Sequence, residues 1–399
     1  MAEAQRGRTV AALGTAQTLA WASTYYLPAI LAAPMARDLG VGVPTVFAGF
    51  SFALVVSALL GPRAGRAIDR FGGRPVLMAT SVVFAAGLAL LGTAQGPAGL
   101  FIAWAVLGIG MGSGLYEAAF AALVRLYGRD SRNVITGITL IAGFASTVGW
   151  PLTAWIDATQ GWRTACFAWA GLHLLVGLPL NGLLPRASAA SATQADPGAS
   201  ASSAVDARPA RTAWLLAFVF AVTWFISTAM AAHLPRLLQA GGATLAVAVA
   251  VGALVGPAQV AGRLLEFGLL RRVHPLLSAR LAAAMHPLGA AVFVLAGAPA
   301  ATLFALLHGA GNGILTIAKG TLPLVLFGPA GYGERQGLLM VPARIAQALS
   351  PWLFGLCLDR FDAGAMWVSA LLGLAALGAL LLLRPPADAA PARRLEASV

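Results

Sequence analysis

Long apolar stretches alternate with short polar ones along the whole chain. The apolar stretches lie near residues 10–32, 44–65, 76–95, 98–125, 134–156, 163–184, 212–233, 243–264, 276–297, 300–327, 336–358 and 365–383. A helix needs about 20 apolar residues to cross a hydrocarbon core about 30 Å thick, whereas barrel strands are short and alternate in polarity. Backbone groups in lipid must be paired within the segment. The pattern therefore predicts an all-α membrane protein with twelve transmembrane helices.

The segment between the sixth and seventh apolar stretches differs in composition from the rest. Residues 185–211 are rich in Ala, Ser and Pro and show no hydrophobic periodicity, which is typical of a flexible linker. The sequence thus predicts an N-terminal six-helix bundle over 1–184, a cytoplasmic linker over 185–211, a C-terminal six-helix bundle over 212–384 and a cytoplasmic tail over 385–399.

The composition excludes several classes of protein. Apolar residues make up 59% of the 399 residues and charged residues only 10%, against roughly 25% charged in soluble domains. Soluble and disordered chains are therefore excluded. The two cysteines, Cys166 and Cys357, lie in apolar stretches and are predicted to be free thiols, and no metal-binding Cys spacing occurs. We expect no cofactor and no metal.

The basic side chains are distributed unevenly among the loops. With the N-terminus in the cytoplasm, 20 of the 26 Lys and Arg residues fall in cytoplasmic segments and four in outside loops, while Lys319 and Arg344 lie within spans. This bias predicts a multi-pass protein of the cell inner membrane with both termini cytoplasmic. The net charge of +12 would then face anionic lipid headgroups, so no nucleic-acid partner is expected.

The second half of the chain repeats features of the first half at an offset near 200 residues. The second predicted span and the loop after it contain Gly61-Pro62 and Gly65-Arg66-x-x-Asp69-x-x-Gly72, which recur as Gly256-Pro257 and Gly262-Arg263-x-x-Glu266-x-Gly268. The fourth span contains Gly110-x-Gly112-Ser113-Gly114, which recurs as Gly309-x-Gly311-Asn312-Gly313. Two shorter matches are Pro151 with Pro351, and Leu27-Pro28 with Leu234-Pro235. The repeat predicts two pseudo-symmetric bundles, an architecture that places binding sites near the midplane between the halves. The glycine runs lie inside spans, where they favour close helix packing over a phosphate loop.

Residues 65–74, Gly-Arg-Ala-Ile-Asp-Arg-Phe-Gly-Gly-Arg, resemble the signature of the major facilitator superfamily (MFS) of transporters. The span number, the linker and the repeat extend this resemblance over the whole chain. The region with Glu117 and Gly161-Trp162-Arg163 is similar to the oxalate/formate and monocarboxylate branch. The resemblance implies a monomeric secondary transporter, not an enzyme, that moves a small-molecule substrate by alternating access.

The resemblance also implies a gate on the cytoplasmic side. Its residues would be Gly65, Asp69, Arg70, Gly72 and Arg74, with Glu266 as the counterpart in the second half. Gly65 permits close helix approach, and Asp69 suits the positive N-terminal end of a helix. Arg70 and Arg74 are expected to pair with Asp69 or with other loop acids. The alternative is a positively charged turn that only sets orientation.

Few ionisable side chains lie within the predicted spans, where each costs about 2.5–3.5 kcal/mol. Glu117 is expected to share a helical face with Ser113 and to take up and release the coupling proton; the alternative is a permanent pair with an arginine. Arg344, with Gln347 nearby, suits a planar anion. The alternative for Arg344 is a fixed pair with Glu117 or with backbone carbonyls.

Polar stripes on further helices complete the predicted substrate site. Lys319 lies on one stripe with His308 and Asn312, although its long stem would also let it reach the surface. The first span carries Gln17, Trp21 and Tyr25 on one broad face. His173, His233 and His286 are predicted to be packing residues. The expected substrate-binding residues are Arg344, Lys319, Asn312, His308, Gln17, Trp21, Tyr25 and Gln347.

The charges in this set favour one class of solute. Lys319 and Arg344 against Glu117 leave a net charge of +1, which favours an anionic or zwitterionic organic solute moved with protons or another coupling ion. The alternative is an efflux pump for drugs or metalloid compounds. A membrane sensor would need an output domain and a membrane enzyme would need a nucleophile–base cluster, and the sequence contains neither.

Overall fold

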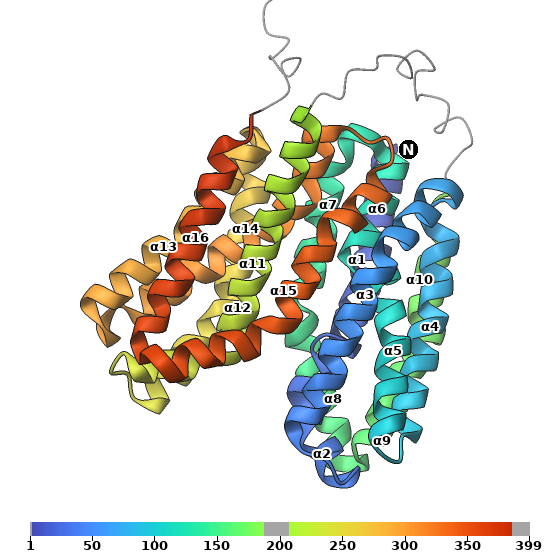
Figure 1. Ribbon diagram of the computed structural model, residues 1–399. Helices are drawn as coiled ribbons and strands as arrows, with labels where there is room; N and C mark the ends of the chain where they lie inside the picture. The colour runs from blue at the N-terminus through green and yellow to red at the C-terminus, as the bar shows by residue number, and fades with distance from the viewer. Residues whose placement is uncertain (1, 187–206, 385–399) are drawn as a thin grey trace, which may run out of the picture.

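The computed structural model describes residues 2–186 and 207–384, and every regular element in these ranges is a helix (Figure 1). The helices form two groups, one from each half of the chain. The groups approach each other at the end where α1 begins and α16 ends, which we call the terminal side, and diverge toward the opposite end, the distal side. The predicted all-α membrane architecture of two related halves is confirmed.

The first half contains more and shorter helices than the second. Its helices are α1 (Ala2–Ser23), α2 (Leu27–Asp38), α3 (Val43–Phe71), α4 (Gly73–Thr93), α5 (Pro97–Gly114), α6 (Tyr116–Tyr127), α7 (Ser131–Ala142), α8 (Ala145–Gln160), α9 (Trp162–Leu172) and α10 (Leu178–Gly182). The second half contains α11 (Ala207–Ala240), α12 (Leu245–Gly268), α13 (Pro275–Ala296), α14 (Ala301–Phe327), α15 (Tyr332–Phe361) and α16 (Ala365–Leu382).

Proline and glycine mark many of the helix ends. Pro97 and Pro275 are the first residues of α5 and α13, where a missing N–H costs nothing. Gly72, with φ +86°, ends α3 and turns the chain directly into α4. An L-residue with a side chain would be strained at this left-handed φ, so a glycine suits the turn.

Four predicted segments of the first half are interrupted, whereas those of the second half are continuous. Segment 10–32 divides into α1 and α2, and segment 134–156 into α7 and α8. A π-helical turn over 173–177 separates α9 from α10. The break between α5 and α6 lies at Leu115, whose backbone is extended (φ −82°, ψ −166°). This last break places two functional residues on different helices, as described below.

Eight helical stretches in the described part of the chain are long and apolar enough to cross a membrane. Two of them, 97–160 and 332–382, run over several consecutive helices. The chain is therefore a multi-pass membrane protein, while the count of twelve spans stays a prediction. Both cysteines are free thiols, as predicted.

The domain boundaries stay a prediction, because most of the predicted linker and the predicted tail lie outside the described residues, at 187–206 and 385–399. Helix α11 begins at Ala207, so residues 207–211, which we assigned to the linker, are helical. The halves contact each other mainly where α3 packs along α15, with further contacts of α6 against α15 and of α7 against α12 and α14. These contacts position the residues of the candidate site.

Candidate functional site

An ion pair joins the two halves of the molecule. Glu117 is the second residue of α6, and Arg344 lies near the middle of α15. The Arg344 Nη2 donates to Glu117 Oε2 at 2.9 Å, and the two side chains are only 3% and 16% exposed. Of the alternatives that the sequence left open for Arg344, the structure contains the pair with Glu117.

A chain of hydrogen bonds extends this pair back to the first half. Arg344 Nη1 donates to Gln347 Oε1 at 3.0 Å, and Gln347 Nε2 donates to the Tyr25 hydroxyl at 2.7 Å. Tyr25 lies in the break between α1 and α2, where the chain is not helical. The network therefore runs from α6 through α15 to the break after α1 and joins the two halves.

Four aromatic rings, Trp21, Tyr25, Tyr116 and Trp224, surround this network and are called the aromatic cluster. Trp21 from α1 and Trp224 from α11 are nearly parallel, with an interplanar angle of 7° and ring centroids 6.5 Å apart. Tyr116 and Tyr25 lie 4.8 Å and 5.2 Å from Trp21. The rings come from both halves and offer flat apolar surfaces beside the charges.

Lys319 on α14 directs its ammonium into the aromatic cluster. Its Nζ lies 4.2 Å from the centroid of the Trp224 ring, and the Arg344 guanidinium carbon lies 5.5 Å from the same centroid. Both are cation–π contacts. The Lys319 side chain is buried and, among the described residues, its ammonium makes no hydrogen bond or ion pair. Glu117 pairs with Arg344, and Lys319 is a second basic side chain beside this single acid.

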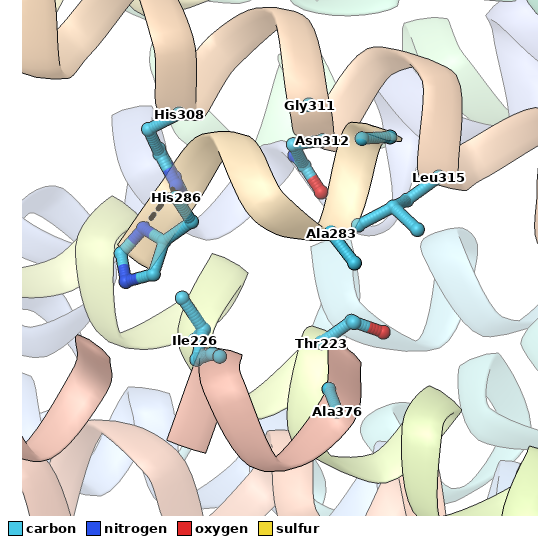
Figure 2. A pocket seen from close by; sticks show the side chains of 11 residues that line it. Thr223, Ile226, Ala283, His286, His308, Gly311, Asn312, Leu315 and Ala376 are labelled. Atoms are coloured by element: carbon cyan, nitrogen blue, oxygen red, sulfur yellow. Dashed lines mark hydrogen bonds between the residues drawn. The ribbon is translucent and has the colours of Figure 1, made fainter. Parts of the chain in front are cut away.

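His308 and Asn312 lie elsewhere, although they share a helical face with Lys319. They line a cavity of about 30 Å³ between α11, α13, α14 and α16, shown in Figure 2. There His308 Nδ1 lies 3.0 Å from His286 Nδ1, so one imidazole donates to the other. Eleven residues of helix, roughly 16 Å, separate His308 from Lys319. A shared helical face therefore does not bring His308 and Asn312 to the same site as Lys319.

Gln17 also lies away from the ion pair. Its Nε2 donates to the carbonyl of Gly114 at 2.7 Å, within the first half. The expectation that Ser113 shares a face with Glu117 was wrong, because the break at Leu115 separates them. Instead, the Ser113 hydroxyl donates to the Ile109 carbonyl at 2.8 Å and lies 3.0 Å from the Thr80 hydroxyl.

At the terminal side, Asp69 on α3 binds the N-terminus of α15 in the other half. Asp69 Oδ1 accepts from the Gly333 N–H at 3.0 Å and Oδ2 from the Glu334 N–H at 2.9 Å. These are amides that a helix start leaves unpaired. Gly65 lies directly against Gly333, and a Cβ at Gly65 would overlap the Gly333 carbonyl.

The arginines of the predicted gate behave differently from the expectation. Arg70 lies over the Phe71 ring, 5.0 Å from its centroid. Within residues 2–186 and 207–384, neither Arg70 nor Arg74 forms an ion pair, so their expected pairing with acids was wrong. Arg66 instead pairs with Glu334 at 2.7 Å. Arg66 precedes Arg70 by one turn on the same face of α3 and is the arginine that reaches the start of α15.

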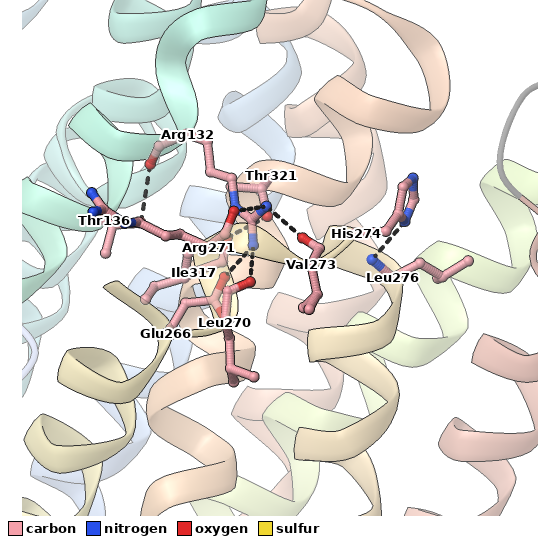
Figure 3. Close-up of polar contacts among 10 residues, drawn as sticks. All are labelled: Arg132, Thr136, Glu266, Leu270, Arg271, Val273, His274, Leu276, Ile317 and Thr321. Atoms are coloured by element: carbon pink, nitrogen blue, oxygen red, sulfur yellow. Dashed lines mark hydrogen bonds and ion pairs between the residues drawn. The ribbon is translucent and has the colours of Figure 1, made fainter. Parts of the chain in front are cut away.

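Glu266 forms the corresponding contact between α12 and α7, shown in Figure 3. Arg132 Nη2 lies 2.7 Å from Glu266 Oε1, with side chains 19% and 4% exposed. Arg132 also donates to the carbonyls of Leu270, Arg271 and Val273 at 3.0, 3.1 and 2.9 Å. The guanidinium thus caps the chain where α12 ends.

Sequence reasoning missed several of these partners. Trp224 and Tyr116 were not selected, although a tryptophan deep within a span, far from the interfaces where it is enriched, is a usable signal. Arg132 was considered only as loop charge. No pattern in the sequence links it to Glu266, which lies 134 positions away.

Comparison with known proteins gives consistent results. The model of the family described as Major Facilitator Superfamily matches residues 13–322. An uncharacterised 38 kDa protein in the 23S RNA operon of Thermoproteus tenax is 30% identical over 332 residues, covering 82% of each chain.

Solved structures with the same fold share little sequence identity with this chain. The human organic anion transporter MFSD10 (TETRAN) has a TM-score of 0.71 at 16% identity, covering 94% of this chain and 99% of its own. The MFS transporter FucP in the outward conformation has a TM-score of 0.73 at 15% identity, covering 93% and 97%. A double Trp mutant of XylE has a TM-score of 0.76 at 14% identity, covering 94% of each chain.

Proposed function

This chain belongs to the major facilitator superfamily and is a membrane transporter, and we propose that it moves a small anionic or zwitterionic organic solute together with protons. It would act as a monomer in the cell inner membrane, with both termini and the terminal side in the cytoplasm. The observation that carries the proposal is the buried Glu117–Arg344 pair between the halves.

The pair offers a direct route to coupling. Removing one partner of a buried ion pair costs about 3–5 kcal/mol because the other charge is left uncompensated. Protonation of Glu117 removes its charge and leaves Arg344 in need of an anion. A solute carboxylate can supply it through two parallel hydrogen bonds to the guanidinium. Proton and solute would then bind together. When Glu117 loses its proton and pairs with Arg344 again, the solute would lose its binding partner and be released.

The surroundings of the pair support this solute class. Lys319 and Arg344 are two basic side chains beside one acid of the described residues, Glu117. The aromatic cluster provides apolar surfaces for the organic part of the solute, and Gln347 and Tyr25 provide polar groups that orient it. His308, Asn312 and Gln17 lie outside this arrangement, so we place the site at Arg344, Lys319, Trp21, Tyr25 and Gln347.

The contacts at the terminal side are the proposed gate. Asp69 and Gly65 on α3, and Glu266 on α12, each bind a helix of the opposite half. Rocking the halves apart at this side would require these contacts to break, while the distal side closes. Alternating access around the site at Arg344 follows from that motion.

The test uses purified protein in liposomes with an imposed pH gradient and a panel of organic acids. A glutamine mimics a protonated carboxyl, so Glu117→Gln should lose gradient-driven accumulation of the preferred acid while keeping exchange of that acid across the membrane. Glu334→Gln, which removes an exposed acid at the terminal side, is the matched control and should keep accumulation. Full accumulation by Glu117→Gln would remove Glu117 from the coupling role.

The second candidate function is export of drugs or metalloid compounds. The parallel Trp21 and Trp224 rings favour it, since flat apolar surfaces bind many aromatic compounds. A toxicity panel in an export-deficient host distinguishes the two functions. Protection against uncharged or cationic compounds that survives Arg344→Ala would favour export of drugs, because the anion site would then be dispensable.

A further inference from the structure

A second, smaller cavity lies inside the first half, away from the Arg344 network. It is bounded by α1, α4, the π-helical turn 173–177 and α10, and its volume of about 10 Å³ fits one water molecule or one ion. π-helical turns occur often at functional positions. The polar side chains that line the cavity are Gln17, Thr80, Ser81, His173 and Asn181.

Two amide oxygens that line this cavity have no partner. Gln17 Nε2 donates to the Gly114 carbonyl at 2.7 Å, and Asn181 Nδ2 donates to the Leu77 carbonyl at 3.2 Å. Because a carbonyl accepts only from a donor, these bonds fix which end of each amide is the oxygen. Gln17 and Asn181 are 2% and 7% exposed, and their oxygens make no hydrogen bond within the described residues.

Two hydroxyl oxygens also line the cavity, and that of Ser81 accepts from Asn181 Nδ2 at 3.0 Å. The hydroxyls of Thr80 and Ser81 donate their hydrogens to the carbonyls of Val76 and Leu77. On the other side of the His173 ring, Ser23 Oγ lies 2.8 Å from His173 Nε2 and 2.8 Å from the Leu19 carbonyl.

We infer that this cavity binds a monovalent cation, for which Na⁺ has the best chemical fit. Amide and hydroxyl oxygens are ligands that hard cations prefer. No carboxylate lines the cavity, which favours a single positive charge over a divalent ion. A single cation can be bound by both amide oxygens at once, and the experiment below separates it from a water molecule that donates to both.

The position of the site connects it to the break before Glu117. Gln17, a proposed ligand, holds the carbonyl of Gly114, the last residue of α5. An ion that fixes Gln17 would therefore fix the start of α6, on which Glu117 lies. The inference stands apart from the proposed proton coupling, since it concerns ion binding in the absence of solute and of a pH gradient.

The test is thermal unfolding of the full purified chain in detergent, in NaCl, KCl or choline chloride at one ionic strength. Saturating Na⁺ should raise the unfolding temperature by at least about 3 °C over choline, because an ion that binds only the folded state stabilises it. Asn181→Ala, which lacks one ligand, should need at least about tenfold more Na⁺ for half of its shift. Asn181→Asp, which adds a carboxylate at the same size, should need several-fold less.

The matched control is Ser369→Ala on α16, which removes an equally buried hydroxyl from the other half and should keep the wild-type response to Na⁺. The absence of any Na⁺-specific shift in the wild-type chain would overturn the inference and assign the cavity to water. An identical Na⁺ response in the wild-type chain and Asn181→Asp would also overturn it, and this comparison decides the matter even where Asn181→Ala fails to fold.

Discussion

The two contacts that join the halves at the terminal side are related by the internal repeat but built differently. In the α3–α15 contact, backbone meets backbone, with Gly65 against Gly333 and Asp69 bonded to main-chain amides. In the α7–α12 contact, side chains meet, with Arg132 bonded to Glu266. Gly262, the counterpart of Gly65, packs instead against Ala310 of its own half.

In both contacts a charged side chain of the first half binds main-chain groups of the second half, but the two side chains have opposite charges. Asp69 compensates the positive N-terminal end of α15, whereas Arg132 donates to carbonyls of the 3-10 turn 270–272 and of Val273, directly after α12. The ion pair beside Asp69, Arg66–Glu334, is 55% and 39% exposed, while Glu266 is 4% exposed. The α3–α15 contact should therefore depend on the close packing of two glycine backbones, and the α7–α12 contact on the buried Arg132–Glu266 pair.

The largest effect on transport is expected at the close contact of Gly65 with Gly333. Gly65→Leu introduces a side chain into the Gly333 backbone, so the halves can no longer approach at the terminal side. Transport in liposomes should fall by more than about tenfold, since forced overpacking costs about 1–3 kcal/mol or more. Gly256→Leu on α12, where a Cβ meets nothing within 4 Å, is the control and should stay active. Equal activity of both variants would show that close approach at Gly65 is dispensable.

The largest effect on stability is expected at the buried pair. Arg132→Ala leaves the Glu266 carboxylate without its partner in a buried position and should lower the free energy of unfolding by about 3–5 kcal/mol. Denaturant or thermal unfolding in detergent measures it. The double variant Arg132→Ala/Glu266→Gln should recover part of the loss, because no charge is then left uncompensated. Losses that simply add would mean that the two side chains are not coupled.

A smaller effect is expected at Asp69. Asp69→Asn keeps one acceptor oxygen for the α15 amides but loses the negative charge, which should cost about 0.5–2 kcal/mol of unfolding free energy. Arg66→Ala, which removes only the exposed pair with Glu334, should change stability by less than about 1 kcal/mol. A larger loss of stability in Arg66→Ala than in Asp69→Asn would contradict this expectation, because the exposed ion pair would then matter more than the bonds of Asp69 to the α15 amides.

The smallest effect is a pH dependence beside the α7–α12 contact. His274 Nδ1 accepts from the Leu276 N–H at 3.2 Å and caps α13 (Figure 3). Burial, and then the charges of Arg132 and Arg280, lower the pKa of His274. Its contribution is therefore present above the ordinary histidine pKa and is lost as the pH falls through the lowered value.

The contribution of His274 is measured by comparing the free energy of unfolding at pH 7 and at pH 5. The wild-type chain should lose up to about 1 kcal/mol more than His274→Asn, because asparagine caps without titrating. The same slope in both chains would assign the pH dependence to other groups.

Parts of the site were accessible to reasoning from the sequence. Asp69, within the segment that resembles the family signature, was expected to suit the positive end of a helix, and the structure identifies that helix as α15. Arg344 and Glu117 were selected because charge is costly in lipid, and their pairing was one of the stated alternatives. His308 and Gln17 were selected as members of polar helix stripes but belong to separate cavities.

The sequence by itself determined the membrane class, the duplicated halves and the set of charged residues that must avoid lipid, because hydrophobicity and charge act locally along the chain. Only the tertiary structure decided which of these residues meet. Glu117 and Arg344 lie 227 positions apart, and the break at Leu115 turns Glu117 away from Ser113. Such pairings depend on how whole helices pack, and helix packing is set by many weak contacts that no short stretch of sequence contains.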